Sequence, residues 1–261
     1  MKSTLKAATA FGCLLLLLSI VPAFAYADDS FIIVSDVDDT VKVTDIVHLK
    51  RALKAALTSK LVFAGMPELY RQLLGPGSSS ERLTFISGAP RSLEMKVDGT
   101  LQSAGFPPYT LVLRKHRELK TPVLEYKLSR LREMYGSPGT GFLLIGDDTE
   151  KDPEVYVEFS RSPNDRIYIH RITGRALPAR CIPFVTAYDI ALQEFLLGRL
   201  TEAQAAAVGD EVLTSSDRSL FPSFQKCPAQ FAPATALPGS LSTIKNQIER
   251  RITKLCASRE D

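Results

Sequence analysis

The sequence predicts an α/β fold with a doubly wound, mainly parallel sheet, no large cap over the sheet, and a C-terminal helical extension. Two observations support this prediction. Short apolar runs recur along the chain with stretches of helical length between them, which is the pattern of a parallel sheet covered by helices. The apolar runs are continuous rather than alternating, which indicates strands that are buried on both faces.

Five apolar runs are predicted to form the strands of this sheet. They lie at 31–35, 83–87, 110–114, 141–145 and 166–170. Helices are predicted at 48–58, 67–74, 91–104 and 123–135. Pro67 falls in the first turn of one of them, where its missing N–H breaks no hydrogen bond.

Beyond about residue 175 the strand pattern stops and helical signals replace it. Gly198 is placed to end one helix, and Thr201 with Gln204 forms a capping box that opens the next. Residues 228–239 are rich in Pro and Ala, which is typical of a linker or an extended surface segment.

A last helix is predicted at about 240–256, with one apolar face and basic residues elsewhere. The apolar face consists of Leu241, Ile244, Ile248, Ile252 and Leu255. We expect this face to pack on the domain. The alternative is peripheral contact with a membrane surface.

The first 25 residues are predicted to be a cleaved secretory signal peptide. Lysines precede an apolar stretch at 11–21, and small residues follow at Ala23 and Ala25. A membrane anchor is disfavoured because the stretch is shorter than the roughly 20 residues that cross a bilayer. Cleavage is expected after Ala25, with Ala27 as the second choice. The mature protein is therefore expected to be exported, either to the periplasm or out of the cell.

The predicted organisation is a signal peptide at 1–25, an α/β domain at 26–175 and a helical extension at 176–261, packed on the domain or tethered to it. Loss of the signal lysines lowers the formal charge from +3 to +1. A charge that small gives no strong field for nucleic acid, so no nucleic-acid partner is expected.

Three cysteines remain after removal of the signal peptide, namely Cys181, Cys227 and Cys256. Their spacing fits no metal site, and an oxidising compartment permits one disulfide with one free thiol. The pairing of Cys227 with Cys256 is favoured, although the sequence alone leaves the pairing open.

Polar residues follow three of the five predicted strands, at the edge of the sheet where open α/β proteins bind ligands. The first strand runs into Asp36, Asp38 and Thr40, the second ends at Ser87 and Gly88, and the fourth leads to Gly146, Asp147 and Asp152. Lys127 lies near the start of the helix that precedes the fourth strand.

This set of residues suits phosphoryl transfer, which needs a nucleophile, a proton donor and neutralisation of phosphate charge. Asp36 is the candidate nucleophile and Asp38 the candidate acid and base. The carboxylates of Asp36 and Asp147 and the backbone carbonyl of Asp38 could hold Mg²⁺, which prefers oxygen ligands. Ser87 and Lys127 could hold the phosphate.

Each piece alone has a simpler explanation as a helix cap, a turn residue or a solvated lysine. The order and spacing of all the pieces favour a catalytic site. A calcium loop of the EF-hand type is excluded, because Val41 and Val47 stand where its glycine and its bidentate glutamate belong. The three histidines His48, His116 and His170 are scattered, and His170 is predicted to end a strand without a metal or catalytic role.

These residues resemble the four motifs of the haloacid dehalogenase superfamily. A closer resemblance is to the phosphatidate phosphatase catalytic domain, known from the fungal actin-patch phosphatase and bacterial relatives, and it covers about residues 31–172. The segments that carry it are Ser35-Asp36-Val37-Asp38-Asp39-Thr40-Val41-Lys42, Ser87-Gly88-Ala89-Pro90, Gly105-Phe106-Pro107 and Ile145-Gly146-Asp147-Asp148-Thr149-Glu150-Lys151-Asp152-Pro153-Glu154-Val155-Tyr156.

The resemblance implies a magnesium-dependent phosphatase that releases phosphate from phosphatidate through a phosphoaspartyl intermediate on Asp36. Its implied roles are catalysis by Asp36 and Asp38, substrate binding by Thr40, Ser87, Gly88 and Lys127, and metal binding by Asp36, Asp38, Asp147 and Asp152. The sequence departs from the family in two places. Asp148-Thr149 replaces the usual Ser-Gly, and Lys115 and Lys120 compete with Lys127 for the lysine role.

The spacing of the motifs leaves no room for a large cap, since about 40 residues between Ser87 and Lys127 hold only a helix, a strand and a loop. The segment 41–82 could form a small helical cover at most. An open site admits bulky substrates such as lipid head groups. The leading hypothesis is therefore a lipid phosphatase, and the alternatives are a phosphatase for soluble or protein-bound phosphates and a non-catalytic phosphate-binding module.

Overall fold

The computed structural model describes residues 31–45, 60–136, 141–232 and 237–259. The predicted signal peptide at 1–25 and the predicted helix at 48–58 lie outside the described residues. Among the residues that are described, no helix combines the length and the apolar composition needed to cross a membrane.

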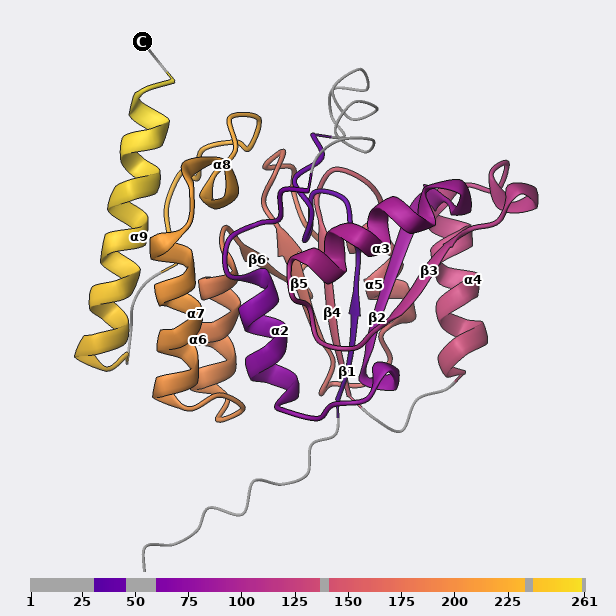
Figure 1. Cartoon of the computed structure of the whole chain (residues 1–261), viewed down its shortest axis with the longest axis horizontal. Helices are drawn as coiled ribbons and strands as arrows, with labels where there is room; N and C mark the ends of the chain where they lie inside the picture. Colours follow the sequence, from indigo (N-terminus) through magenta and orange to yellow (C-terminus); the bar gives the residue numbers. More distant parts are fainter. Residues whose placement is uncertain (1–30, 46–59, 137–140, 233–236, 260–261) are drawn as a thin grey trace, which may run out of the picture.

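Six strands of the described residues form one sheet, and every neighbouring pair is parallel. The strands are β1 (Ile32–Ser35), β2 (Leu83–Pro90), β3 (Thr110–Arg114), β4 (Phe142–Asp147), β5 (Arg166–His170) and β6 (Cys181–Phe184). Their order is β3-β2-β1-β4-β5-β6, so the chain winds outward from β1 in one direction and then from β4 in the other (Figure 1). This is the predicted doubly wound fold.

Helices cover both faces of the sheet (Figure 1). They are α2 (Met66–Leu74), α3 (Glu94–Ser103), α4 (Val123–Tyr135), α5 (Asp152–Phe159), α6 (Ala187–Leu196), α7 (Glu202–Thr214), α8 (Asp217–Leu220) and α9 (Gly239–Ala257). Short 3₁₀ turns lie at Ser80–Arg82, Arg91–Leu93 and His116–Glu118. Between β2 and α4 the chain forms only α3, β3 and two of these turns, so this connection contains no cap.

The central strands are buried on both faces, as their continuous apolar sequences predict. Neighbouring residues of β4 enter different cores: Leu143 and Ile145 pack with α2, α3 and α6, whereas Phe142 and Leu144 pack with α4 and α5. All four are at most 1% exposed. Burial of apolar surface on both sides contributes about 25 cal/mol per Å² and makes this part of the sheet a rigid base for the loops at its edge.

The prediction that strands stop near residue 175 is wrong, because β6 adds a sixth strand at Cys181–Phe184. This strand has only four residues and contains Pro183, whose missing N–H confines it to a sheet edge. The run is too short and too interrupted to stand out in the sequence. The predicted domain boundary at 175 rests on the end of the strand pattern in the sequence, and the sheet extends beyond it.

The C-terminal helices share the larger of the two hydrophobic cores with the sheet. The predicted capping box is confirmed at the start of α7, where Thr201 Oγ1 accepts the Gln204 N–H at 3.2 Å and Gln204 Oε1 accepts the Thr201 N–H at 2.9 Å. On α9, Leu241, Ile248 and Ile252 are buried, while Ile244 and Leu255 are partly buried against the same core.

The predicted disulfide between Cys227 and Cys256 is confirmed. It joins the segment after α8 to the last turns of α9 and thereby fixes the C-terminal helix to the body of the protein. Cys181 is the free cysteine among the described residues, and it is buried on β6.

Candidate active site

The loop after β1 continues the strand for one residue and then turns sharply. The Asp36 N–H donates to the Ile145 carbonyl at 2.8 Å, and the Val37 carbonyl accepts the N–H groups of Val41 and Lys42. Asp39 lies in the turn with a left-handed φ of 56°. An aspartate tolerates this conformation better than most residues, because its short polar side chain can hydrogen-bond to the local backbone.

The Asp39 carboxylate stabilises the turn from within. Its Oδ1 accepts the backbone N–H of Thr44 at 2.9 Å and that of Asp45 at 2.8 Å. Asp39 is buried, so these bonds are shielded from water. Asp39 therefore shapes the loop on which Asp36 and Asp38 stand.

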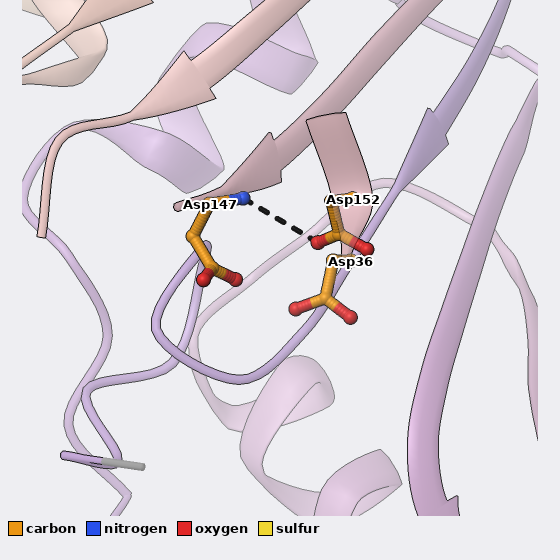
Figure 2. Close-up of side chains that lie close together, drawn as sticks. All are labelled: Asp36, Asp147 and Asp152. Atoms are coloured by element: carbon orange, nitrogen blue, oxygen red, sulfur yellow. Dashed lines mark hydrogen bonds between the residues drawn. The ribbon is translucent and has the colours of Figure 1, made fainter. Parts of the chain in front are cut away.

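Three carboxylates converge at the carboxyl ends of β1 and β4. Asp36 follows β1, Asp147 ends β4 and Asp152 opens α5, and all three are buried. One carboxylate oxygen from each lies within 4.8 Å of the others, and Figure 2 shows the side chains gathered at one point. The Asp147 N–H also donates to Asp152 Oδ2 at 3.4 Å. β1 and β4 flank the point where the strand order reverses, which is the usual ligand position in such sheets.

Lys127 bridges two of these three carboxylates. Its Nζ donates to Asp36 Oδ1 at 2.6 Å and to Asp152 Oδ1 at 2.5 Å, and the side chain is fully buried. The competing candidates Lys115 and Lys120 are both exposed. Of the three lysines that the sequence proposed, Lys127 is therefore the one that the structure brings to the carboxylates.

The charges of the cluster do not balance, because three carboxylates face one ammonium group. Burial raises the pKa of the Asp36 carboxyl well above its usual value, although the nearby Lys127 ammonium lowers it in part. Burial and repulsion from Asp152 likewise raise the pKa of the Asp147 carboxyl well above its usual value. Burial lowers the pKa of the Lys127 ammonium, but attraction to Asp152 and Asp36 raises it by more, so the net pKa lies well above the usual value. Buried oxygen ligands with excess negative charge fit a small divalent cation.

Gly146 allows α5 to approach β4 closely enough for Asp152 to join the cluster. A Cβ atom at Gly146 would lie 2.5 Å from the Asp152 Cβ and 2.8 Å from the ring of Tyr156. Any side chain at this position would push the start of α5 away. The glycine of the Gly146-Asp147 motif therefore serves the geometry of the third carboxylate.

The remaining predicted site residues surround the cluster. Asp38 accepts hydrogen bonds from Ser87 Oγ at 3.1 Å and from Thr44 Oγ1 at 2.9 Å, and its carboxylate is outside the group of three. Thr40 Oγ1 donates to Asp147 Oδ2 at 3.1 Å. Gly88 is next to Ser87, and a Cβ added there would meet Val123 and Glu150 at 3.5 and 3.6 Å.

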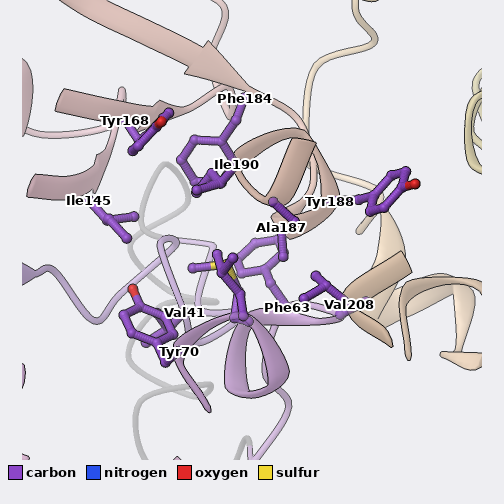
Figure 3. Close-up of a cluster of buried hydrophobic side chains, with 14 of the residues drawn as sticks. Val41, Phe63, Tyr70, Ile145, Tyr168, Phe184, Ala187, Tyr188, Ile190 and Val208 are labelled. Atoms are coloured by element: carbon purple, nitrogen blue, oxygen red, sulfur yellow. The ribbon is translucent and has the colours of Figure 1, made fainter. Parts of the chain in front are cut away.

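Val41 anchors the loop in the hydrophobic core. It is fully buried and packs in the same cluster as Phe63, Ala187 and Ile145 (Figure 3). The loop that carries the acidic residues is thus held by apolar contacts with the C-terminal helices as well as by its own hydrogen bonds.

Sequence reasoning missed a contact between the C-terminal segment and this loop. His170 is buried at the end of β5, and its Nδ1 lies 2.9 Å from the Asp39 carbonyl. Burial lowers the pKa of His170 to about 4, so the ring is neutral at neutral pH. Gln225 Nε2 lies 3.1 Å from His170 Nε2 and also donates to the Arg171 carbonyl at 3.2 Å. Nε2 also lies 3.1 Å from the Val185 carbonyl, so each ring nitrogen faces a carbonyl oxygen. We assign the proton to Nδ1, because its contact with the Asp39 carbonyl is the shorter of the two and because the Gln225 amide can then donate to the unprotonated Nε2.

Asp148, the residue that departs from the family pattern, has a structural role. Its carboxylate accepts the N–H groups of Ile172 at 2.9 Å, Thr173 at 2.6 Å and Gly174 at 2.9 Å. These bonds tie the loop after β4 to the loop after β5. Thr149 fixes the orientation of the Asp147 carboxylate, because Asp147 Oδ1 accepts the Thr149 N–H at 2.6 Å.

A protein-family model described as the phosphatidate phosphatase APP1 catalytic domain matches residues 31–172. The match covers more than half of the chain and contains the three carboxylates of the cluster and Lys127. Neither the curated proteins nor the solved structures contain a match to this chain.

Proposed function

Because this chain belongs to the phosphatidate phosphatase APP1 catalytic-domain family and is thereby a phosphomonoester hydrolase, we propose that it is a magnesium-dependent phosphatase of phosphatidate or a related lipid phosphate. The observation that carries the proposal is the buried group of Asp36, Asp147 and Asp152 around Lys127 within the family-matched residues. Carboxylates with one ammonium group can hold a cation and a phosphate together.

In the proposed reaction, Asp36 attacks the phosphorus atom and the bond to the ester oxygen breaks. Lys127 holds Asp36 Oδ1, so we assign the attack to Oδ2. Asp38 gives its proton to the leaving oxygen. It then takes a proton from the water that attacks the phosphoaspartate, which releases phosphate and restores Asp36.

Asp36, Asp147 and Asp152 would hold the magnesium ion, with the backbone carbonyl of Asp38 as a further ligand. The bound ion would supply neutralisation of the carboxylate and phosphate charges. Ser87 and Gly88 would bind the phosphate next to Asp38, to which the Ser87 hydroxyl already donates. The Thr40 hydroxyl donates to the Asp147 carboxylate. We propose that Thr40 orients Asp147 as a metal ligand and also lies next to the bound phosphate.

Export is part of the proposal. The signal-like sequence at 1–25 supports it, and so does the disulfide between Cys227 and Cys256. Disulfides persist in the periplasm and outside the cell and are rare in the cytosol. The proposed substrate would then be met outside the cytoplasm.

The function is tested with purified mature protein, dioleoyl phosphatidate in mixed micelles and a panel of soluble phosphate esters. We expect phosphate release from phosphatidate that requires added Mg²⁺ and stops on chelation. Strong turnover of the soluble esters with none of phosphatidate would contradict the lipid substrate. Equal turnover of phosphatidate after removal of all divalent ions would contradict the role of the metal.

Replacing Gln225 with alanine is expected to lower kcat, because His170 loses the group that fixes its tautomer and thus its hydrogen bond to the Asp39 carbonyl. Loss of a group that hydrogen-bonds to a metal ligand costs about 10- to 100-fold in metal affinity or activity. Gln225 acts one step further out, through His170 and the Asp39 backbone, so we expect a loss at the lower end of this range. Gln225 touches no proposed reacting group, so it is a positioning residue. The readouts are kcat, KM and the Mg²⁺ concentration for half-maximal activity, and we expect the effect in kcat and the magnesium requirement rather than in KM.

Gln247→Ala is the matched control, because Gln247 is an exposed residue of α9 on the same C-terminal segment. It should behave as the wild type. A folded Gln225→Ala protein with unchanged kcat and unchanged magnesium requirement would show that the contact has no part in catalysis.

A further inference from the structure

A cavity of about 810 Å³ lies beside β6, and none of the three carboxylates is among its lining residues. Its walls are the loop 171–179 after β5, the edge strand β6 and the segment 226–232. A volume of this size is within the range of roughly 300–1,000 Å³ that is typical of small-molecule sites. All of its lining residues except Arg171 lie outside the family-matched part of the chain.

The cavity carries an excess of positive charge. Arg171, Arg175 and Lys226 line it, and Asp189 is the acidic side chain among its lining residues. Asp189 is engaged elsewhere, since its Oδ2 accepts the N–H groups of Val185 and Thr186 at 2.9 Å. The charge of the site therefore favours an anion.

The three cations differ in how far they are already neutralised. Arg175 is paired with Glu154 at 2.7 Å, whereas Arg171 Nη1 donates to the Arg175 carbonyl at 2.6 Å and has a longer contact of 3.3 Å with Asp148. Lys226 has no ion pair among the described residues. Its side chain lies across Gly174, where an added Cβ would come within 2.7 Å of the Lys226 Cδ. Lys226, helped by Arg171, is thus the cation best placed to receive an anionic group.

The rest of the lining is largely apolar. Leu177, Pro178, Pro183 and Phe231 border the cavity. An inorganic anion would leave this surface in contact with water, and a neutral lipid would leave the exposed Lys226 ammonium without a counter-charge. A molecule with an apolar chain and an anionic end satisfies both parts of the cavity.

We propose that this cavity binds a long-chain carboxylate, with its charged group at Lys226 and Arg171 and its chain against Leu177, Pro183 and Phe231. The site is preorganised on one side, because the disulfide of Cys227 with Cys256 fixes the segment that carries Lys226. It is separate from the acidic cluster, and the proposal does not depend on the phosphatase reaction.

The test is calorimetric titration of the full mature chain with laurate below its micelle concentration and without added metal. We expect saturable binding to the wild type. Lys226→Glu should weaken it at least about tenfold, because a charge-assisted hydrogen bond is replaced by repulsion. Lys226→Gln should show a smaller loss. Lys254→Glu on the exposed side of α9 makes the same change of charge elsewhere and should bind as the wild type does.

The specificity for an anionic end group is tested with dodecanol and dodecylammonium. The position of the site is tested with laurate binding to the Asp36→Asn variant. We expect neither neutral nor cationic probe to match laurate, and we expect Asp36→Asn to bind laurate normally. Equal affinity for the three probes, or unchanged binding in Lys226→Glu, would overturn the proposal. Loss of binding in Asp36→Asn would place the ligand at the acidic cluster and would also overturn it. Since no turnover is measured, failure here leaves the phosphatase proposal standing.

Discussion

Asp36→Asn is expected to abolish phosphate release while leaving the fold intact. The amide of asparagine cannot attack phosphorus, and loss of a group at the centre of catalysis typically lowers kcat by on the order of 10⁴-fold or more. The fold should survive because the asparagine oxygen can still accept the hydrogen bond that Lys127 now donates to Asp36 Oδ1. The measurement is release of phosphate from phosphatidate or from an artificial ester in the presence of Mg²⁺, together with the thermal unfolding midpoint.

The matched control is Asp210→Asn, which makes the same substitution at an exposed position on α7. It should retain wild-type activity. Full activity in Asp36→Asn would remove the proposed mechanism, because no phosphoaspartate could then form at this position.

Much of the fold could be predicted because the central elements carry strong, regular signals. β3, β5 and α4 have the predicted bounds at 110–114, 166–170 and 123–135. Their apolar runs are continuous or amphipathic over their full length. Parallel strands also bring their carboxyl ends to one edge, so the polar residues after the first and fourth strands were expected to meet, and Asp36 and Asp147 do.

Elements that depend on tertiary context were missed. β6 is held by pairing with β5 and contains Pro183, so its own sequence is a weak strand signal. α5 is only eight residues long and begins with Asp152 directly after the loop from β4. An isolated helix of this length is marginal, and α5 is stabilised chiefly by packing Val155, Tyr156 and Phe159 against the sheet.

The sequence also could not reveal the supports of the site. His170 acts on the carbonyl of Asp39, 131 positions earlier, and Gln225 acts on His170 from 55 positions later. A backbone carbonyl carries no residue-specific signal, and the contact between the Gln225 and His170 side chains joins residues far apart in the sequence, so neither contact has a motif. In the sequence Asp148 stands out only as a departure from the family pattern, because the three N–H groups that it binds lie 24 to 26 positions later in the chain.

Asp147→Asn is expected to remove the stabilisation that Mg²⁺ gives to the wild type. A ligand at about 100 times its Kd stabilises the folded state by about 2.7 kcal/mol, which raises the unfolding midpoint by about 2–4 °C per kcal/mol in a protein of this size. Without metal the variant should be no less stable than the wild type. The substitution removes a carboxyl group whose charge is opposed by burial and by repulsion from Asp152, and the asparagine oxygen can still accept the Thr149 N–H.

Asp217→Asn, at an exposed site on α8, is the control for this substitution and should keep the shift with Mg²⁺. A wild-type protein whose unfolding midpoint does not change with Mg²⁺ would argue against a metal at the cluster. So would an Asp147→Asn protein with the full wild-type shift.

The most direct test of a divalent cation site at Asp36, Asp147 and Asp152 is calorimetric titration of Mg²⁺ into the metal-free wild type and into Asp147→Asn. We expect one magnesium site per chain in the wild type, with proton release on binding because burial raises the pKa values of Asp36 and Asp147. We expect no such site in the variant. Equal magnesium binding by the two proteins, or none by the wild type, would contradict a metal site at these carboxylates.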